Sequence, residues 1–233
     1  MWRGCGSRFC GKICCLLINK HTMQGNSQKL LSGPQGSGGA IAEMLRAPLF
    51  VVGLGNPGVK YEQTMHNAGF EFVNVLLAKL SRRKDVEVGQ WKFDKYLQAE
   101  IAEVRRSGEI FMRLVKPVTF MNLSGVAVGL LRKRYDFDVQ QQLVLAYDDL
   151  DIELGNYKIQ YNKKPKDHNG VNDVVRALGT LEFLHIRIGV DGRTGANKIA
   201  GEDYVIMRVG NDDWLTLLET IDTAAEEFTK MVC

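Results

Sequence analysis

The chain has 233 residues, of which 45% are hydrophobic, so it is long enough for one large domain or two small ones with a proper core. No apolar run approaches the roughly 20 residues that a membrane-spanning helix needs. The net charge of +3 is uneven, because residues 1–48 hold six Lys and Arg but one acid, which leaves 24 basic and 26 acidic residues in 49–233. This excludes a generally basic body, so local patches would have to hold any polyanion.

The first 47 residues differ in composition from the rest of the chain. They are rich in Gly, Ser, Gln and basic residues, and 32–39 reads SGPQGSGG, which is typical of a flexible linker. A basic and almost acid-free N-terminus is typical of a mitochondrial transit segment. We therefore expect a flexible extension at 1–47, a domain at 48–233 and a location in the mitochondrion. The alternative is a cytoplasmic protein with an unstructured extension, or with a later start at Met23 or Met44.

The cysteines are concentrated at the two ends of the chain. Four of the five lie near the N-terminus and the fifth is the last residue: Cys5, Cys10, Cys14, Cys15 and Cys233. A disulfide framework would spread them through the fold, so the body is expected to be intracellular and thiol-poor. Zinc binding by the first four is the alternative, although no histidine lies nearby until His21.

Strand and helix patterns alternate along the domain. Leu49–Gly53 is a short β-branched and apolar run that predicts a buried strand, and the glycine-rich turn 53–58 breaks it before a helix that starts near His66. Later patterns predict a hairpin of 96–104 with 110–115, strands at 143–147, 157–161 and 184–190, and helices at 125–135, 171–178, 202–208 and 213–231. This alternation predicts an α/β fold, with a single domain and a mixed, mainly parallel twisted sheet flanked by helices.

A histidine and an aspartate stand where ligands bind in such sheets, at the carboxyl ends of strands. His66 follows the first strand and turn, and Asp148 follows the strand 143–147. A helix N-terminus disfavours an imidazolium, so His66 is expected to be neutral and basic, with Asp148 fixing its tautomer. No Ser or Cys stands in a G-x-S-x-G context, so the pair predicts direct attack by water. The alternatives are a core histidine and a carboxylate that only caps a turn.

Asparagines recur at the junctions between loops and helices: Asn56, Asn67, Asn122 and Asn169. Any one of them would be explained as a helix or turn cap. Together at strand ends, their uncharged amides suit the binding of a peptide backbone and of a developing oxyanion.

Two further patterns concern phosphate groups. The basic run 163–166 directly precedes His168 and Asn169, so it would flank the cleft and could hold phosphates. The segment 53–58 matches G-x-G-x-x-G, the fingerprint of dinucleotide sites. Pro57 and the lack of a strand-ending acid about twenty residues later argue against nicotinamide binding.

Several motifs in register resemble the bacterial-type peptidyl-tRNA hydrolase family. They are GLGNPG with Tyr61 and HNAG, FMNLSG, YDDLD, HNG, and RIGV with the loop that follows, in order from about Leu49 to the C-terminus. The resemblance implies a monomeric esterase, independent of metals and cofactors and with no membrane partner. Its substrate would be peptidyl-tRNA, contacted at the CCA end and acceptor stem, from which it releases the peptide and recycles the tRNA.

The same motifs imply roles for individual residues. His66 would be the catalytic base and Asp148 its partner. The substrate-binding residues would be Asn56, Tyr61, Asn67, Met121, Asn122 and Asn169, and Arg187 would contact the tRNA 5′-phosphate. Further phosphate contacts are expected from the basic run itself, through Lys163, Lys164 and Lys166, and not from the resemblance.

Three departures from the family pattern concern the region around the tRNA. Met65 stands where Arg usually precedes the catalytic histidine, Gln160 replaces an expected lysine, and residues 162–167 replace a Gly-rich loop. We expect lysines of the altered loop to substitute for the missing one. The alternative function is a catalytically inactive RNA-binding relative, of the kind that serves organelle intron splicing on this fold.

Overall fold

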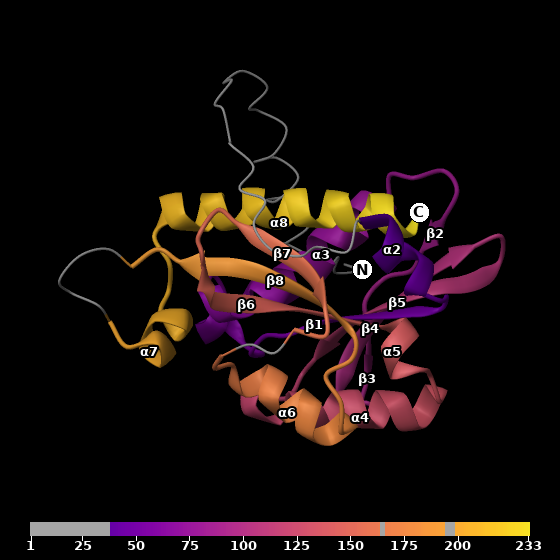
Figure 1. Ribbon diagram of the computed structural model, residues 1–233, viewed down its shortest axis with the longest axis horizontal. Coiled ribbons are helices and arrows are strands. Elements are labelled where there is room, and N and C mark those ends of the chain that lie inside the picture. The colour runs from indigo at the N-terminus through magenta and orange to yellow at the C-terminus, as the bar shows by residue number, and fades with distance from the viewer. Residues whose placement is uncertain (1–37, 164–165, 194–198) are drawn as a thin grey trace, which may run out of the picture. The chain divides into compact units, whose positions relative to one another are not determined.

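A computed structural model describes residues 38–163, 166–193 and 199–233 (Figure 1). In this part of the chain the strands are β1 (Leu49–Gly53), β2 (Glu87–Val88), β3 (Lys92–Asp94), β4 (Ala99–Arg106), β5 (Glu109–Pro117), β6 (Leu143–Glu153), β7 (Tyr157–Tyr161) and β8 (Leu184–Asp191). The α-helices are α2 (Gly38–Met44), α3 (Ala68–Leu80), α4 (Ser124–Tyr135), α5 (Val139–Gln142), α6 (Asn169–Leu178), α7 (Gly201–Ile206) and α8 (Asn211–Val232). Short 3-10 helices are η1 (Val59–Tyr61), η2 (Met65–Asn67) and η3 (Met121–Leu123).

The strands form one mixed sheet with the order β2-β4-β5-β1-β6-β8-β7, and β3 also pairs with β4. Its centre is parallel, because β1 pairs in parallel with β5 and β6, and β6 pairs in parallel with β8. Its outer strands are antiparallel. The predicted α/β fold with a single mixed sheet is confirmed. The carboxyl ends of β1, β5, β6 and β8 consequently share one edge of the sheet, where ligands bind in such folds.

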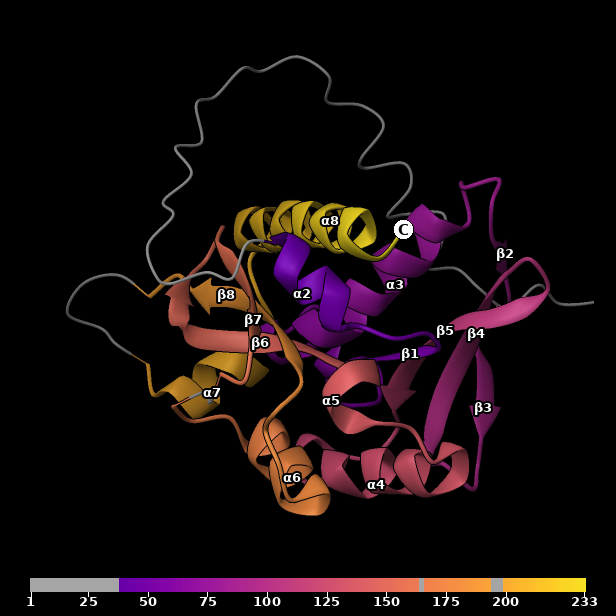
Figure 2. The ribbon, with the colours of Figure 1, turned by 45° about the vertical axis from the view of Figure 1, so that its right-hand side comes forward.

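Helices cover both faces of the sheet. Figures 1 and 2 show α3 and α8 on one face and α4 and α6 on the other. Alternate residues of β1 enter the two cores: Val51 packs with α3 and α8, whereas Phe50 and Val52 pack with α4 and α6. Because β1 is buried on both faces, its sequence is apolar throughout rather than alternating.

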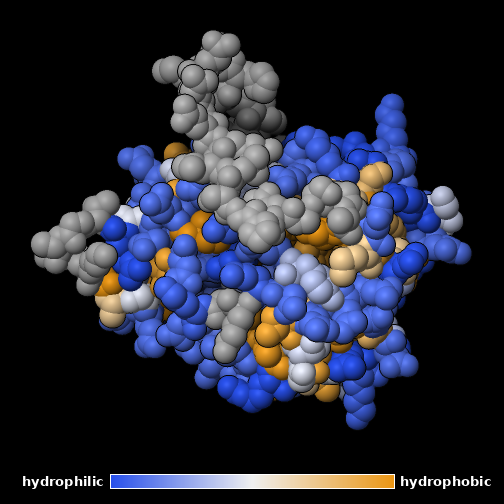
Figure 3. All heavy atoms as spheres, in the orientation of Figure 1, coloured by the Kyte–Doolittle hydropathy of each residue, from blue (hydrophilic) through white to orange (hydrophobic). Residues whose placement is uncertain are grey.

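The molecular surface in Figure 3 is largely hydrophilic, and polar side chains interrupt its apolar areas. In the described residues, no helix combines the length and the apolar character needed to cross a membrane.

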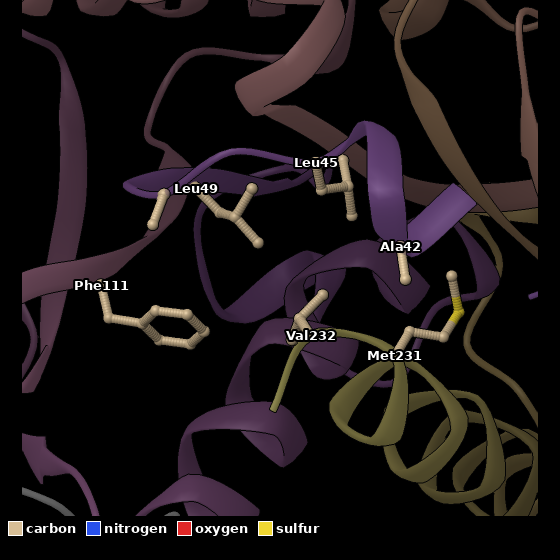
Figure 4. A pocket seen from close by; sticks show the side chains of 7 residues that line it. Ala42, Leu45, Leu49, Phe111, Met231 and Val232 are labelled. Atoms are coloured by element: carbon tan, nitrogen blue, oxygen red, sulfur yellow. The ribbon is translucent and has the colours of Figure 1, made fainter. Parts of the chain in front are cut away.

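The folded part begins earlier than the predicted boundary at residue 48. Leu45 and Ile41 pack against the core that contains α3 and α8, and the Arg46 N–H donates to Gln141 O at 2.9 Å. Figure 4 shows Ala42 and Leu45 facing the end of α8 across a cavity of about 90 Å³. The side chains of Ile41, Ala42 and Leu45 thus join this segment to the domain, which corrects that part of the predicted extension. Residues 1–37 lie outside the described residues, so the extension there stays a prediction.

One strand is longer than its sequence pattern indicates. The run 143–147 continues as β6 to Glu153, because residues beyond Tyr147 still pair with β8. Asp148 therefore lies inside a strand rather than after it. Ala146 is the last residue of β6 that pairs with β1, however, so Asp148 still stands at the carboxyl edge.

Two glycines determine how closely α3 approaches the end of β1. A Cβ at Gly53 would overlap the carbonyl of Gly69, and a Cβ at Gly69 would overlap the backbone of Leu54 and Ala146. The Leu54 N–H donates to Ala146 O at 2.9 Å, and the Phe70 N–H donates to Leu54 O at 3.2 Å. This backbone contact sets the position of η2, which directly precedes α3.

We expect Gly69→Ala to lower the free energy of unfolding by about 3 kcal/mol, because the added methyl group meets backbone that cannot move aside. Urea denaturation measures this change. The matched control is Gly129→Ala in α4, where the new Cβ meets Ala177 at 4.0 Å. The control should be more stable than the wild type by about 0.5–1 kcal/mol, since Gly is unfavourable inside a helix. Equal stability of Gly69→Ala and the wild type would contradict the close approach.

Candidate active site

The carboxylate of Asp148 lies between two histidine rings at the carboxyl edge of the sheet. His66 Nδ1 is 2.9 Å from Asp148 Oδ1 and 3.0 Å from Oδ2. His168 Nε2 is 3.0 Å from Asp148 Oδ1. His66 belongs to η2, Asp148 to β6, and His168 is the N-cap of α6. The fold thus brings His66 and Asp148 into contact although 82 positions separate them in the chain.

The hydrogen bonds determine which ring nitrogens carry protons. The Val171 N–H donates to His168 Nδ1 at 3.2 Å, so His168 Nε2 carries the hydrogen that Asp148 accepts. An ionised carboxylate accepts only, so His66 Nδ1–H also donates to Asp148. His66 Nε2 is then the unprotonated nitrogen of the neutral ring. That nitrogen is able to accept a proton.

The pKa of His66 is raised and the pKa of Asp148 is lowered, each relative to its ordinary value. Burial lowers the pKa of His66, but the charge and hydrogen bond of Asp148 outweigh burial and raise it above 6.5. Burial raises the pKa of Asp148, but His66 and His168 outweigh burial and hold it well below its usual range. The sequence predicts that the helix N-terminus disfavours the protonated form of His66. In the structure, the carboxylate of Asp148 instead favours the protonated form. The ring lies in η2, one turn before α3, and the carboxylate dominates.

Hydrogen bonds between Asn56 and Asn67 fix the conformation of the loop after β1. Asn56 N–H donates to Asn67 Oδ1 at 2.7 Å, and Asn67 Nδ2 donates back to Asn56 O at 3.2 Å. Asn56 Oδ1 accepts from the Met121 N–H at 2.8 Å, which ties this loop to η3. These bonds leave the Nδ2 group of Asn56 for a ligand. They also occupy both ends of the Asn67 amide, so Asn67 supports Asn56 instead of binding substrate as predicted.

The other predicted substrate-binding residues lie in η1, in η3 and at the start of α6. Asn122 is exposed in η3, and Asn169 is exposed at the first position of α6, next to His168. Met121 is buried and lies against Gly170, where any Cβ would overlap its sulfur. The Tyr61 ring is half-buried, with its centroid 6.3 Å from the exposed Phe120 ring. Of these residues, Asn169 and Met121 are joined to the His–Asp pair through α6, because Asn169 follows His168 and Met121 lies against Gly170.

Arg187 does not stand where a phosphate contact requires it. Its side chain is 5% exposed, its Nε donates to Asp149 Oδ2 at 2.7 Å, and an Nη atom donates to Gln160 Oε1 at 2.8 Å. The guanidinium is thus neutralised inside the sheet layer, which corrects the predicted phosphate contact. Gln160 accepts a hydrogen bond from Arg187, which the ammonium group of a lysine could not do.

In the lysine-rich loop after β7, residues 162–167, the two described lysines are exposed to solvent. Lys163 is exposed, and Lys166 is exposed with its Nζ 3.8 Å from Asp151 Oδ1. Lys164 lies outside the described residues. The loop precedes His168 in the chain, and His168 contacts Asp148.

His168 is the site residue that the motifs do not single out, since H-N-G by itself predicts only the start of a helix. The signal available is a second histidine beside a strand-end aspartate. The same residues also form the group of possible metal ligands in the described chain, with the ligand atoms of His66, Asp148 and His168 within 4.8 Å of one another. A metal ion on His168 Nε2 would need the ring proton on Nδ1, where the Val171 N–H already points. The tautomer of His168 thus favours hydrogen bonding within this group of residues over the binding of a metal ion.

The family comparison agrees with these motifs. Residues 50–233 match the family model described as peptidyl-tRNA hydrolase. A curated relative, peptidyl-tRNA hydrolase of Staphylococcus saprophyticus subsp. saprophyticus, is 38% identical over 176 residues, covering 75% of this chain and 86% of that protein.

Solved structures are similar to the same part of the chain. A crystal structure of peptidyl-tRNA hydrolase from Acinetobacter baumannii has a TM-score of 0.68 at 30% identity, and covers 79% of this chain and 88% of that one. A peptidyl-tRNA hydrolase in complex with N-propanol has a TM-score of 0.62 at 28% identity, with 78% and 90% covered. Sequence and fold therefore point to one group of proteins.

We expect Asp148→Asn to lower the pKa of His66 from above 6.5 to below it, because burial then acts on the ring without the opposing carboxylate. NMR titration of the histidine ring protons measures this shift. His185, whose pKa burial lowers to about 4, is the internal control and should titrate unchanged. An unchanged His66 pKa would contradict the dominance of Asp148.

Proposed function

This chain belongs to the peptidyl-tRNA hydrolase family and hydrolyses peptidyl-tRNA, and we propose that water activated by His66 attacks the ester bond between the peptide and the tRNA. The observation that carries this mechanism is the contact of His66 Nδ1 with Asp148 at 2.9 Å. It orients the ring and leaves Nε2 as the base. Water is the nucleophile because no Ser or Cys of the sequence stands in the strand-to-helix turn that presents a protein nucleophile.

The first step moves one proton and forms one bond. His66 Nε2 removes a proton from water while the resulting hydroxide bonds to the ester carbonyl carbon. Asp148 remains ionised, because its two imidazole partners keep its pKa low, and it stabilises the imidazolium. The base must be neutral to act, so the rate rises with pH through the raised pKa of His66.

The second step releases the tRNA. The tetrahedral oxyanion accepts hydrogen bonds from Asn56 Nδ2 and Asn122, whose donors carry no charge of their own. When the intermediate collapses, the bond to the 3′-terminal ribose oxygen breaks and that oxygen takes the proton from His66. The peptide leaves as a carboxylic acid, which then loses its proton to solvent and becomes a carboxylate. Asn169 positions the substrate and water, and Tyr61 and Met121 line the pocket.

The tRNA end is held by the lysine-rich loop in this proposal. Arg187 is paired with Asp149, so phosphates of the CCA end and acceptor stem are contacted by Lys163, Lys164 and Lys166. We further propose that the chain acts as a monomer, as its resemblance to the family implies. An inactive RNA-binding relative is not favoured, because the His–Asp pair is intact.

Replacing His66 by Ala should lower the single-turnover rate of diacetyl-Lys-tRNA hydrolysis by about 10²–10⁴, the usual contribution of a general base. The control is Lys230→Ala near the C-terminal end of α8, where a 73% exposed side chain is changed away from the site. The control should react at the wild-type rate. Equal rates for His66→Ala and the wild type would remove His66 as the base and revive the RNA-binding alternative.

Replacing Lys163, Lys164 and Lys166 together by Ala should raise KM for peptidyl-tRNA several-fold and leave kcat unchanged, because the phosphates lose partners while the reacting groups do not. The salt dependence of tRNA binding should also weaken by about one unit of slope for each lysine that touches a phosphate. Lys230→Ala again serves as the control. An unchanged KM would show that the loop does not hold the tRNA.

We propose a mitochondrial location from the basic, acid-poor composition of residues 1–47. Those residues, fused to a fluorescent protein, should carry it into mitochondria. Replacing Arg3, Arg8 and Lys12 by Ala should reduce import, since positive charge drives it. A wild-type fusion that stays in the cytoplasm would contradict the proposal.

A further inference from the structure

A second set of buried polar side chains lies behind the His–Asp centre, between β6, β8 and α6. The Tyr147 hydroxyl is 3.2 Å from His185 Nδ1, and His185 Nε2 is 3.1 Å from Leu181 O. A carbonyl only accepts, so His185 Nε2–H donates to it and the Tyr147 O–H donates to His185 Nδ1. Tyr147 and His185 are both 0% exposed. The proposed reaction uses neither of them.

Ring stacking and hydrogen bonding fix the side chains of Tyr147 and His185. The His185 ring stacks on Phe183, with centroids 4.4 Å apart and an angle of 20° between the planes. Burial lowers the pKa of His185 to about 4, so its Nδ1 remains an acceptor at neutral pH. A phenol and an imidazole are costly in a buried layer unless they are paired. The pairing fixes the direction in which the Tyr147 ring points.

The fixed ring reaches the catalytic centre through His168. The Tyr147 ring packs edge-on against the His168 ring, with centroids 5.2 Å apart at 70°. His168 in turn donates to Asp148 at 3.0 Å. An unbroken series of contacts therefore runs from His185 through Tyr147 and His168 to the carboxylate that orients His66.

We propose that Tyr147, locked by its hydrogen bond to His185, is a positioning residue that holds the His168 ring and, through it, the carboxylate of Asp148. The inference rests on the proposed roles of Asp148 and His66. Tyr147 acts through packing, because burial raises the pKa of its hydroxyl beyond any working pH. The charged groups that act on it are Arg187 from β8, and Asp149 and Asp148 from β6. None of them exchanges a proton with it.

The test removes the hydrogen bond while keeping the rings. Tyr147→Phe leaves His185 without a donor, and His185→Phe leaves the Tyr147 hydroxyl without an acceptor, so each single variant should lose stability. The double variant Tyr147→Phe/His185→Phe has no orphaned polar group and should regain stability. A purely structural role predicts that activity recovers with stability.

A positioning role predicts a different outcome. All three variants should show kcat lowered by about tenfold with KM unchanged, as is usual when a residue that supports a catalytic group is altered. The pKa of His66, measured by NMR titration, should fall in each, because Asp148 is held less well. Phe137→Leu is the matched control. It removes a buried aromatic ring from the same core and should change neither kcat nor the His66 pKa.

A double variant that regains both stability and full kcat would overturn the proposal, and so would a wild-type His66 pKa in Tyr147→Phe. The NMR measurement does not depend on catalysis. A failure of the proposed function would appear instead as full activity of His66→Ala, so the two failures are distinguishable.

Discussion

The site depends on one carboxylate that accepts hydrogen bonds from two imidazoles. Asp148 lies in the strand β6 and is 2% exposed, so its charge would be costly without these donors. His66 and His168 supply them, at 2.9 and 3.0 Å from the same oxygen, Oδ1. The contact with Asp148 also orients His66, the proposed base, and raises its pKa. Stability and reactivity at this position therefore have one physical source.

The close backbone contact between β1 and α3 determines where His66 lies. Gly53 and Gly69 let β1 and α3 touch where a methyl group would overlap, and η2 follows from that contact. Asn67 then braces Asn56 through two hydrogen bonds, so the loop that carries the proposed oxyanion donor is rigid. A rigid site suits a reaction whose catalysis depends on preorganised donors.

The structure explains two departures from the family pattern, at Met65 and at Gln160. Met65, which replaces an arginine, is fully buried in the core with α3 and α8 and so acts as an apolar anchor for η2. Gln160, which replaces a lysine, accepts from the buried Arg187. Both substitutions remove a positive charge that the family pattern carries. In the proposed function, the lysine-rich loop before His168 supplies the charge that holds the tRNA.

The sequence by itself determined the longer strands and helices, the family, and the polar residues at strand ends, because periodicity and motif spacing are local properties of the chain. It also pointed to His66 and Asp148, since both stand at strand ends that topology brings to one edge. It did not reveal the short elements α2, α5, β2 and β3. Only the tertiary structure decided that Arg187 is buried against Asp149, and that His168 is a second donor to Asp148. These outcomes depend on which side chains of neighbouring strands and helices face one another. That information arises only when distant segments pack.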